Sequence, residues 1–454
     1  MSSDLPDTPT HCVAIVGGAV AGAEVAAHLA DHGVISVVIE QNPRPYGKIE
    51  DGLPRWHHAL REKEYGRIRE NLSRPRVHYL PSTRVGKDVD FAELSAGWGF
   101  SAVVLACGAW KDRSLPIEGA EQFVGKGLVY QNPFVIWFNH KEEASYDGPV
   151  FETPDGGIVV GGGLASIDVA KILMLESVQA KLVERGLEID LIDLELKGIP
   201  KTLAAHGLAY EDLGLEGCTI FYRRGLDDMP LVSPPDDPDL CTPERMEKVK
   251  KSRRRLLEKA TNKYRFEVVS NSAPDALIVE DDRLVGLIFR RTRIEGGRVI
   301  PTDETFEKRG SCVISSIGSI PEPIRGIDMK GELFEFTDWD LGRLEAFPNV
   351  FSVGNVVTGK GNVAASRKHA SHIAEDALEV FLGVDDEDDR DADPVNAASE
   401  RARRTAREIA RELIDIEPAS PERVAEIFEK VRARQRAVGY TGDLATWLEK
   451  VTPA

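Results

Sequence analysis

The chain has 454 residues, of which 42% are apolar and 29% are charged, as in an ordinary soluble globular protein. Its length predicts two or three domains. The formal net charge of -18 argues against a general nucleic-acid binder, which needs a basic surface. Any docking site for an acidic partner must therefore be a local basic patch.

Five cysteines are scattered along the chain without a C-x-x-C pair. This spacing excludes a thioredoxin-like dithiol relay and a local all-cysteine zinc or iron–sulfur site, so we expect no metal centre. The first residues lack the basic region and the apolar core of a signal peptide, so we expect none, and no apolar run approaches the ~20 residues of a membrane span. We expect free thiols in a cytoplasmic protein that contacts neither membrane nor nucleic acid.

The first motif extends from Cys12 to Glu40. It contains an apolar stretch, a turn from Gly17 to Gly22, a helical pattern and a second apolar stretch that ends in the acid. This is the order of a dinucleotide-binding βαβ unit. Gly17 permits the tight turn, Gly22 permits close packing of helix on strand, and Glu40 can accept hydrogen bonds from a ribose. Ala19 departs from the pattern, because its methyl group stands where the backbone should approach a phosphate closely.

The same order recurs after residue 157, with Gly161 and Gly163 in the turn. The second strand of this unit ends in Arg223 and Arg224 instead of an acid. An acid suits a ribose with free hydroxyls, whereas guanidinium groups suit a 2′-phosphate. The contrast predicts FAD in the first unit and NADPH in the second.

A basic helix is expected at residues 244–260. Such a run of charge is either a solvated face or the place where an acidic electron carrier docks, and the sequence leaves both open. The basic residues that would contact a carrier are Lys248, Lys251, Arg254 and Arg255.

Two similar apolar strands, at residues 101–109 and 312–318, flank the second unit and indicate that it interrupts the first domain. A later glycine loop at residues 349–362, followed by a helical pattern, would direct N–H groups toward the flavin. We therefore predict an α/β fold with two Rossmann-like domains. The predicted segments are an FAD-binding domain (first part, 1–150), an inserted NADP-binding domain (151–310), and an FAD-binding domain (second part, 311–383).

An acidic linker is predicted at 384–394 and a helical C-terminal extension at 395–454. One helix of the extension should begin with Ser420 as N-cap and Pro421 at its first position. The residues on its apolar face are Val424, Ile427, Phe428 and Val431. The extension could pack on the body, mediate dimerisation or contact a partner, and the sequence does not choose.

From residue 12 to about 382 the chain resembles the adrenodoxin reductase and glutamate synthase small-subunit class of flavoproteins. The resemblance lies in the first turn with its acid, the loop at residues 45–53, the second turn, the paired arginines and the loop at 354–359. It implies that His57 and Asp168 shape the contact between nicotinamide and flavin. It also implies FAD-binding roles for Gly17, Ala19, Gly22, Glu40, Gly47, Gly354, Asn355 and Gly359. The NADPH-binding residues that it implies are Gly161, Gly163, Leu164, Arg223 and Arg224.

The chain departs from this class at several points. Ala19 replaces a glycine, and Asn355 stands where the two branches have Trp or Asp. No glutamate after Arg224 matches the active-site acid of the adrenodoxin reductase branch. The cysteine-rich iron–sulfur extension of glutamate synthase small subunits is absent as well.

The function that the resemblance implies is an FAD-dependent oxidoreductase that passes electrons from NADPH to a one-electron carrier, most directly a ferredoxin. Two alternatives stay open. The chain could be the reductase component of a larger complex that docks through the C-terminal extension. It could also be a nucleotide-bound regulatory or scaffold flavoprotein that has lost turnover.

Overall fold

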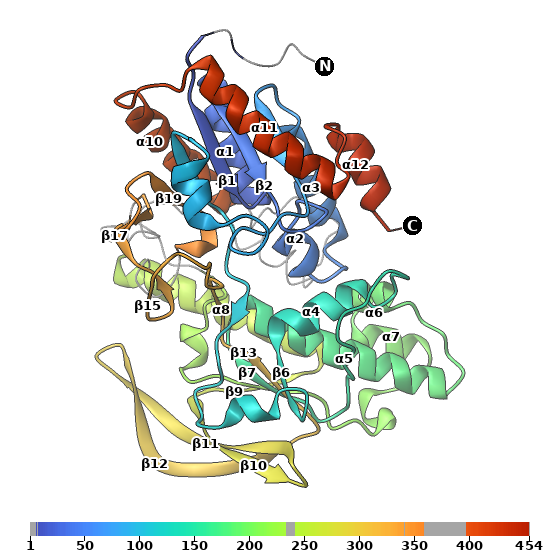
Figure 1. Ribbon diagram of the computed structural model, residues 1–454. Helices are drawn as coiled ribbons and strands as arrows, with labels where there is room; N and C mark the ends of the chain where they lie inside the picture. The colour runs from blue at the N-terminus through green and yellow to red at the C-terminus, as the bar shows by residue number, and fades with distance from the viewer. Residues whose placement is uncertain (1–5, 7, 233–240, 340, 358–395, 454) are drawn as a thin grey trace.

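The computed structural model of the protein describes residues 6, 8–232, 241–339, 341–357 and 396–453. Two parallel five-stranded sheets form two units, one above the other in Figure 1. The first sheet has the order β19-β4-β1-β2-β3, with β1 (Cys12–Val16), β2 (Ile35–Ile39), β3 (Val77–Leu80), β4 (Ala102–Leu105) and β19 (Val350–Ser352). The second has the order β6-β13-β7-β8-β9, with β6 (Leu128–Tyr130), β7 (Ile158–Gly161), β8 (Thr219–Phe221), β9 (Glu267–Val269) and β13 (Val313–Ser316). The predicted α/β class with two Rossmann-like units is confirmed.

The inner strands are mostly apolar because both faces of each sheet are covered. Helices cover both faces of the first sheet, whereas the second sheet has helices on one face and the buried residues Leu284, Leu287 and Phe289 of an antiparallel strand on the other. All five residues of β1 and of β2 are buried, and β1 pairs in parallel with β2 and β4. The helices before the extension are α1 (Val20–Asp31), α2 (Lys48–Asp51), α3 (His58–Leu72), α4 (Gln131–His140), α5 (Leu164–Glu184), α6 (Leu191–Lys197), α7 (Ile199–Ala205) and α8 (Pro243–Tyr264). Short helical turns lie at Glu93–Gly97, Ala120–Phe123, Tyr210–Leu213, Leu226–Asp228 and Gly354–Val356.

A third, antiparallel sheet extends from the second unit. Its strands are β10 (Ser272–Glu280), β11 (Arg283–Glu295) and β12 (Arg298–Arg309). In Figure 1 the β11–β12 hairpin is a long curved ribbon that reaches away from the lower unit. The remaining strands form two-residue or three-residue pairs: β5 (Lys111–Asp112) with β14 (Ser319–Ile320), β15 (Met329–Lys330) with β16 (Leu333–Phe334), and β17 (Phe336–Asp338) with β18 (Arg343–Leu344).

The second sheet reaches beyond the range 151–310 on both sides. Its edge strand β6 precedes that range, and β13 follows it but pairs with β6 and β7. The strand at 312–318 therefore does not resume the first sheet as its likeness to 101–109 had indicated; β19 closes the first sheet beside β4. The apolar composition of a buried strand is the same in either sheet, so composition alone could not assign it.

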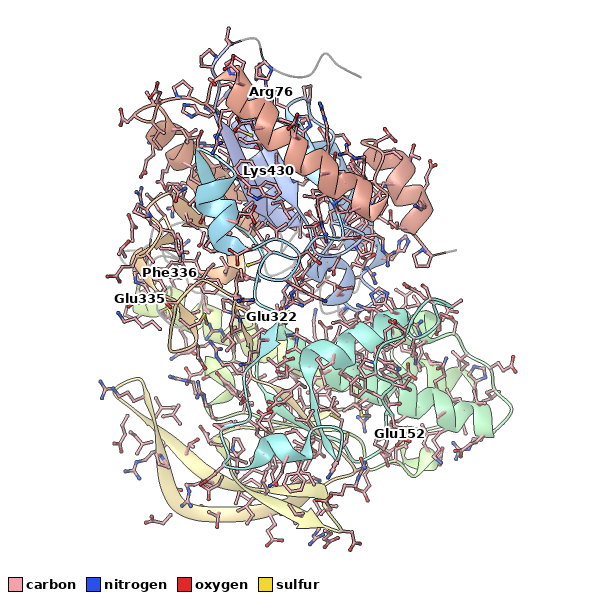
Figure 2. All side chains as sticks on the ribbon, viewed as in Figure 1. Arg76, Glu152, Glu322, Glu335, Phe336 and Lys430 are labelled. Carbon is pink, nitrogen blue, oxygen red and sulfur yellow. The ribbon has the colours of Figure 1, made fainter. Side chains whose placement is uncertain are left out.

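The C-terminal extension packs on the first unit, as the helices in red show in Figure 1. It contains α10 (Asn396–Leu413), α11 (Pro421–Val438) and α12 (Leu444–Val451). Ser420 caps α11 as predicted, and the four residues of its predicted apolar face are buried. Lys430, labelled in Figure 2, reaches from α11 to the Gly97 carbonyl with an Nζ–O distance of 2.9 Å. Of the three roles that the sequence left open, the structure shows packing on the body.

Candidate functional site

The first glycine turn is a backbone arrangement that excludes side chains. Gly17 has a φ of +107°, and a Cβ there would lie 2.6 Å from the Ala106 carbonyl oxygen. A Cβ on Gly22 would lie 1.9 Å from the Gly17 oxygen. Helix α1 begins beyond this turn with no acidic residue in its first turn and no side-chain cap. Its N-terminal N–H groups and dipole form a site that favours an anion such as a diphosphate.

Ala19, the residue that breaks the glycine pattern, is the N-cap of α1. Its φ of -74° is ordinary for a residue with a side chain, so the backbone does not require glycine there. Its methyl group points at Gly47, since a Cβ on Gly47 would lie 2.9 Å from the Ala19 Cβ. Gly47 itself has a φ of +50°. The absence of a side chain at Gly47 therefore makes room for the methyl group of Ala19.

Glu40 follows β2 and is buried beside the turn. Its carboxylate accepts hydrogen bonds from the backbone N–H of Gly18 (2.7 Å) and of Asn42 (2.9 Å). Burial raises the pKa of this carboxyl, and the two backbone hydrogen bonds oppose the increase. The carboxylate is fixed against the turn, where its remaining acceptor capacity faces the cavity.

A cavity of about 400 Å³ opens over the first sheet. Six of the residues that the sequence predicted for FAD line it together: Gly17, Ala19, Glu40, Gly47, Gly354 and Asn355. Gly359 lies outside the described residues. The glycine cradle, the uncapped helix N-terminus and the buried acid fit a dinucleotide with a diphosphate and a ribose. The lining residues that sequence reasoning missed include Lys48, Arg84, Cys107, Trp110, Glu322 and Arg401.

Two cations line this cavity from the first unit. Arg84 pairs with Glu322 at 2.7 Å, and Figure 2 shows Glu322 between the two units. Lys48 donates to Asn132 Oδ1 and to a serine hydroxyl of β14, each at 3.2 Å. Burial lowers the pKa of Lys48 to about 8, although nearby Asp112 opposes the change. The loop sequence after β2 could have indicated Lys48 as a lining residue. Nothing in the sequence near Lys48 or Arg84 indicated which residues these two cations contact.

The second glycine turn follows the same steric logic. A Cβ on Gly161 would lie 2.3 Å from both Ser166 Oγ and the Ser316 carbonyl oxygen. Ser166 Oγ hydrogen-bonds Ser316 Oγ at 3.1 Å, which ties α5 to β13. Gly163, the N-cap of α5, has open space where a Cβ would be, and Leu164 begins the helix. The N-terminus of α5 is thus a second site that can receive a phosphate.

Arg223 and Arg224 follow β8, where the sequence placed them. Arg223 is exposed and Arg224 is half-buried. Arg224 Nη2 donates to the Gly297 carbonyl at the tip of the β11–β12 hairpin (3.0 Å), and Thr292 Oγ1 donates to the Arg223 carbonyl (2.8 Å). The hairpin therefore supports the strand end that carries both guanidinium groups, a contribution the sequence did not reveal.

His57 and Asp168 come from different units and meet in the interior. His57 precedes α3, Asp168 lies in α5, and their Nε2 and Oδ1 atoms are 3.6 Å apart. Both side chains are buried. Trp56 Nε1 donates to His57 Nε2 at 3.2 Å, and no donor among the described residues reaches Asp168 Oδ1 at hydrogen-bond distance. The predicted pair is thus a buried contact between the two nucleotide units.

The predicted docking residues share the solvent-facing side of α8. Lys248, Lys251, Arg254 and Arg255 are exposed, and they recur at helical spacing. Arg254 pairs with Asp227, so part of this face is neutralised within the chain. Arg253, in the same basic run, is buried and donates to the Val232 and Asp227 carbonyls instead.

All five cysteines of the chain are free, and burial raises the pKa of Cys107, at the cavity, to about 12. Within the described ranges, no three His, Cys, Asp or Glu side chains gather as metal ligands. No helix among those same residues is long and apolar enough to cross a membrane.

Comparisons with known proteins agree with this arrangement. The sequence family described as pyridine nucleotide-disulphide oxidoreductase matches residues 11–197. The chain is 24% identical over 412 residues to the mitochondrial NADPH:adrenodoxin oxidoreductase of Arabidopsis thaliana, which covers 81% of each chain. It is 30% identical over 162 residues to the glutamate synthase [NADPH] small chain of Mycobacterium tuberculosis, covering 34% of this chain and 32% of the relative. The solved structure of FprA from Mycobacterium tuberculosis in complex with NADPH has the same fold, with a TM-score of 0.64, 19% identity and coverage of 94% and 91% of the two chains.

Proposed function

We propose a function from the premise that this chain is a distant homologue of the adrenodoxin reductase, FprA and glutamate synthase small-chain class of pyridine nucleotide-disulphide oxidoreductases. It is an NADPH-dependent FAD oxidoreductase. Its electron acceptor is a one-electron carrier, and an iron–sulfur protein of the ferredoxin kind fits the name of the adrenodoxin oxidoreductase relative.

The observation that carries this proposal is the contact between His57 and Asp168. It joins two nucleotide units whose second strands end differently, one in Glu40 and the other in paired arginines. A flavin held by the first unit and a nicotinamide held by the second would meet near this contact. A protein that merely stored nucleotides would not need the two units to share a buried, polar interface.

Bound flavin would supply the conversion of a hydride into single electrons, and the protein would supply binding and orientation. The α1 N-terminus would bind the FAD diphosphate, and Glu40 would accept a ribose hydroxyl. Arg223 and Arg224 would bind the 2′-phosphate of NADPH. Asp168 Oδ1 would accept an N–H of the nicotinamide carboxamide, because it is buried and lacks a donor among the described residues.

Electrons would leave the flavin directly. None of the five cysteines is bonded to another, and the sequence contains no C-x-x-C pair of the kind that relays electrons in dithiol enzymes. The high pKa of Cys107 keeps its thiol protonated at neutral pH, which makes it a poor nucleophile. The exposed face of α8 would bind the acidic carrier, where opposite charge raises the association rate.

The test begins with the purified protein and its flavin spectrum. NADPH oxidation with an artificial acceptor should proceed, and NADPH-dependent cytochrome c reduction should rise when the right ferredoxin is added. Absence of NADPH oxidation by the FAD-loaded protein would refute the enzyme assignment and favour a regulatory flavoprotein. A cytochrome c rate that no ferredoxin changes would refute the carrier.

The docking face has its own test. Lys248→Glu together with Lys251→Glu should raise the KM for ferredoxin and weaken its dependence on salt, while the rate with the artificial acceptor stays unchanged. Lys181→Glu, a change at a partly exposed position on α5, is the matched control. Equal ferredoxin kinetics in both variants would place the docking site elsewhere.

A further inference from the structure

Behind the contact of His57 with Asp168 lies a fully buried lysine. Lys171 is three residues beyond Asp168 in α5, so the two side chains lie on the same side of the helix. Its side chain has 0% exposure. Its Nζ lies 2.8 Å from Glu195 Oε1, and Glu195 belongs to α6. Tyr264, the last residue of α8, donates its hydroxyl to the same Oε1 at 2.8 Å.

The ammonium group of Lys171 also lies between two aromatic rings. It is 4.7 Å from the centroid of the Trp56 ring and 4.5 Å from that of Tyr264. A cation over an aromatic face is held more strongly where water is excluded, as it is here. Lys171 therefore joins α5, α6 and α8 of the second unit to Trp56 of the first.

Glu195 keeps this cluster electrically neutral. Burial by itself raises the pKa of the Glu195 carboxyl, but the Lys171 ammonium and the hydrogen bonds from Lys171 and Tyr264 outweigh it, so the pKa lies below its usual range. The carboxylate is therefore ionised at neutral pH. An ionised carboxylate in the interior requires its cation, which fixes Lys171 in one position.

Trp56 transmits that position to His57. The indole nitrogen is only a donor, so His57 Nε2, 3.2 Å away, must accept its hydrogen. A neutral imidazole that accepts at Nε2 carries its own proton on Nδ1. The orientation of the Trp56 ring thus decides which nitrogen of His57 holds the proton: with Nδ1 protonated, Nε2, the nitrogen 3.6 Å from Asp168 Oδ1, carries none.

We infer that Lys171 is a positioning residue for His57: its ammonium, fixed by Glu195 and Tyr264, holds the Trp56 indole so that His57 keeps its proton on Nδ1. This inference rests on the proposed function only for its consequence, the orientation of His57 toward a nicotinamide. The proton position itself belongs to the resting protein and is measured without turnover. Failure of the inference and failure of the enzyme assignment are therefore distinguishable.

The experiment is ¹⁵N NMR of protein labelled at its ten histidines. The His57→Gln variant identifies the His57 signals, because they are the ones it removes. In the unmodified protein His57 should show one protonated nitrogen, assigned to Nδ1, and one unprotonated nitrogen. In Lys171→Met it should show a mixture of both tautomers. Lys171→Arg, which retains a cation over the ring, should preserve most of the original pattern.

Two further variants separate positioning from folding. The double change Lys171→Met with Glu195→Gln removes both charges, leaves no unpaired carboxylate and should still give the mixture. Trp56→Phe keeps an aromatic ring but removes the N–H, so it should also give the mixture with the lysine in place. Lys181→Met is the control on the same helix, partly exposed and paired with Glu184, and should change nothing.

A His57 pattern in the double variant that equals the unmodified one would overturn the inference. So would an unchanged pattern in Trp56→Phe, because the indole N–H would then not determine the tautomer. Reduction of bound flavin by NADPH, followed by absorbance, should slow in the double variant while NADPH binding is retained. A loss of NADPH binding alone would also contradict a role in orienting His57.

Discussion

The strongest test of the nucleotide assignment is the removal of the two arginines after β8. NADPH differs from NADH only in its 2′-phosphate, so Arg224→Ala should lower kcat/KM for NADPH and leave kcat/KM for NADH unchanged. A charge-assisted hydrogen bond contributes about 1.5–3 kcal/mol, which corresponds to roughly a 10- to 150-fold loss in kcat/KM for NADPH. Arg224 is half-buried and held by the Gly297 carbonyl, so the loss in kcat/KM caused by Arg224→Ala should lie toward the upper end of this range. Arg223 is exposed, and its replacement should cost less.

The assay compares kcat/KM for NADPH and NADH with one artificial acceptor, in the single variants and in the double variant. Arg309→Ala, an exposed change on β12 that breaks a pair with Glu280, controls for the loss of one positive charge. The ratio of the two coenzymes should fall only in the variants of the β8 arginines. Equal losses for NADH and NADPH, or an unchanged preference in the double variant, would refute the reasoning.

Three further predictions concern buried or cavity-lining charges. Burial raises the pKa of Glu50 from 4.5 to about 7, although the charge of Arg44 opposes the increase. The folded state therefore binds this proton more tightly than the unfolded state does, and stability is lost as the pH rises from 4.5 to about 7. Glu50→Gln should therefore match the parent near pH 4.5 and exceed its free energy of unfolding by about 3 kcal/mol above pH 7, measured by urea denaturation; a difference that does not vary with pH would contradict the shift. Lys171→Met should lower the free energy of unfolding by about 3–5 kcal/mol, because it leaves the buried Glu195 carboxylate unpaired. Adding Glu195→Gln should restore most of the lost free energy. If it restores none, packing and not charge dominates the contribution of Lys171 to stability. Arg401→Gln should weaken FAD binding on the order of tenfold, because it removes a cation that lines the cavity. A flavin fluorescence titration measures this affinity, and the control variant Arg407→Gln should bind FAD as the parent does. Equal affinities of the two variants would show that Arg401 does not bind FAD.

The Arg401 prediction follows from how α10 lies on α1. Arg403 pairs with the buried Glu24 of α1 at 2.7 Å. One turn further along both helices, the charge of Arg407 contributes to the lowered pKa of His28, which burial lowers most. The two helices therefore run in the same direction, with their N-termini at the same end. This places Arg401 near the first turn of α1, where a positive charge opposes the helix dipole unless an anion lies between them.

The amino-acid sequence by itself determined the two nucleotide units and the ends of several helices. The glycines of both turns belong to a local pattern of strand, turn and helix, and Ser420 caps the helix that follows it directly, so these features can be predicted from short stretches. The contacts that exclude a side chain at Gly17 and Gly161, with Ala106 and with Ser316, come from far along the chain. The positions of the acid after β2 and of the arginines after β8 can also be predicted from short stretches, because each follows directly on the end of its strand. What they bind stays a prediction from their position.

The tertiary structure decided everything that depends on partners far along the chain. Strand β13 could have joined either sheet, and only its pairing with β6 and β7 assigned it to the second. The methyl group of Ala19 is accommodated by Gly47, and Lys171 gains its role from Trp56, Glu195 and Tyr264 together. A side chain in a buried helix carries no local signal of which groups surround it, because packing between distant elements supplies them. For that reason the sequence predicted the two halves of the site, whereas the structure showed the buried contacts that join them.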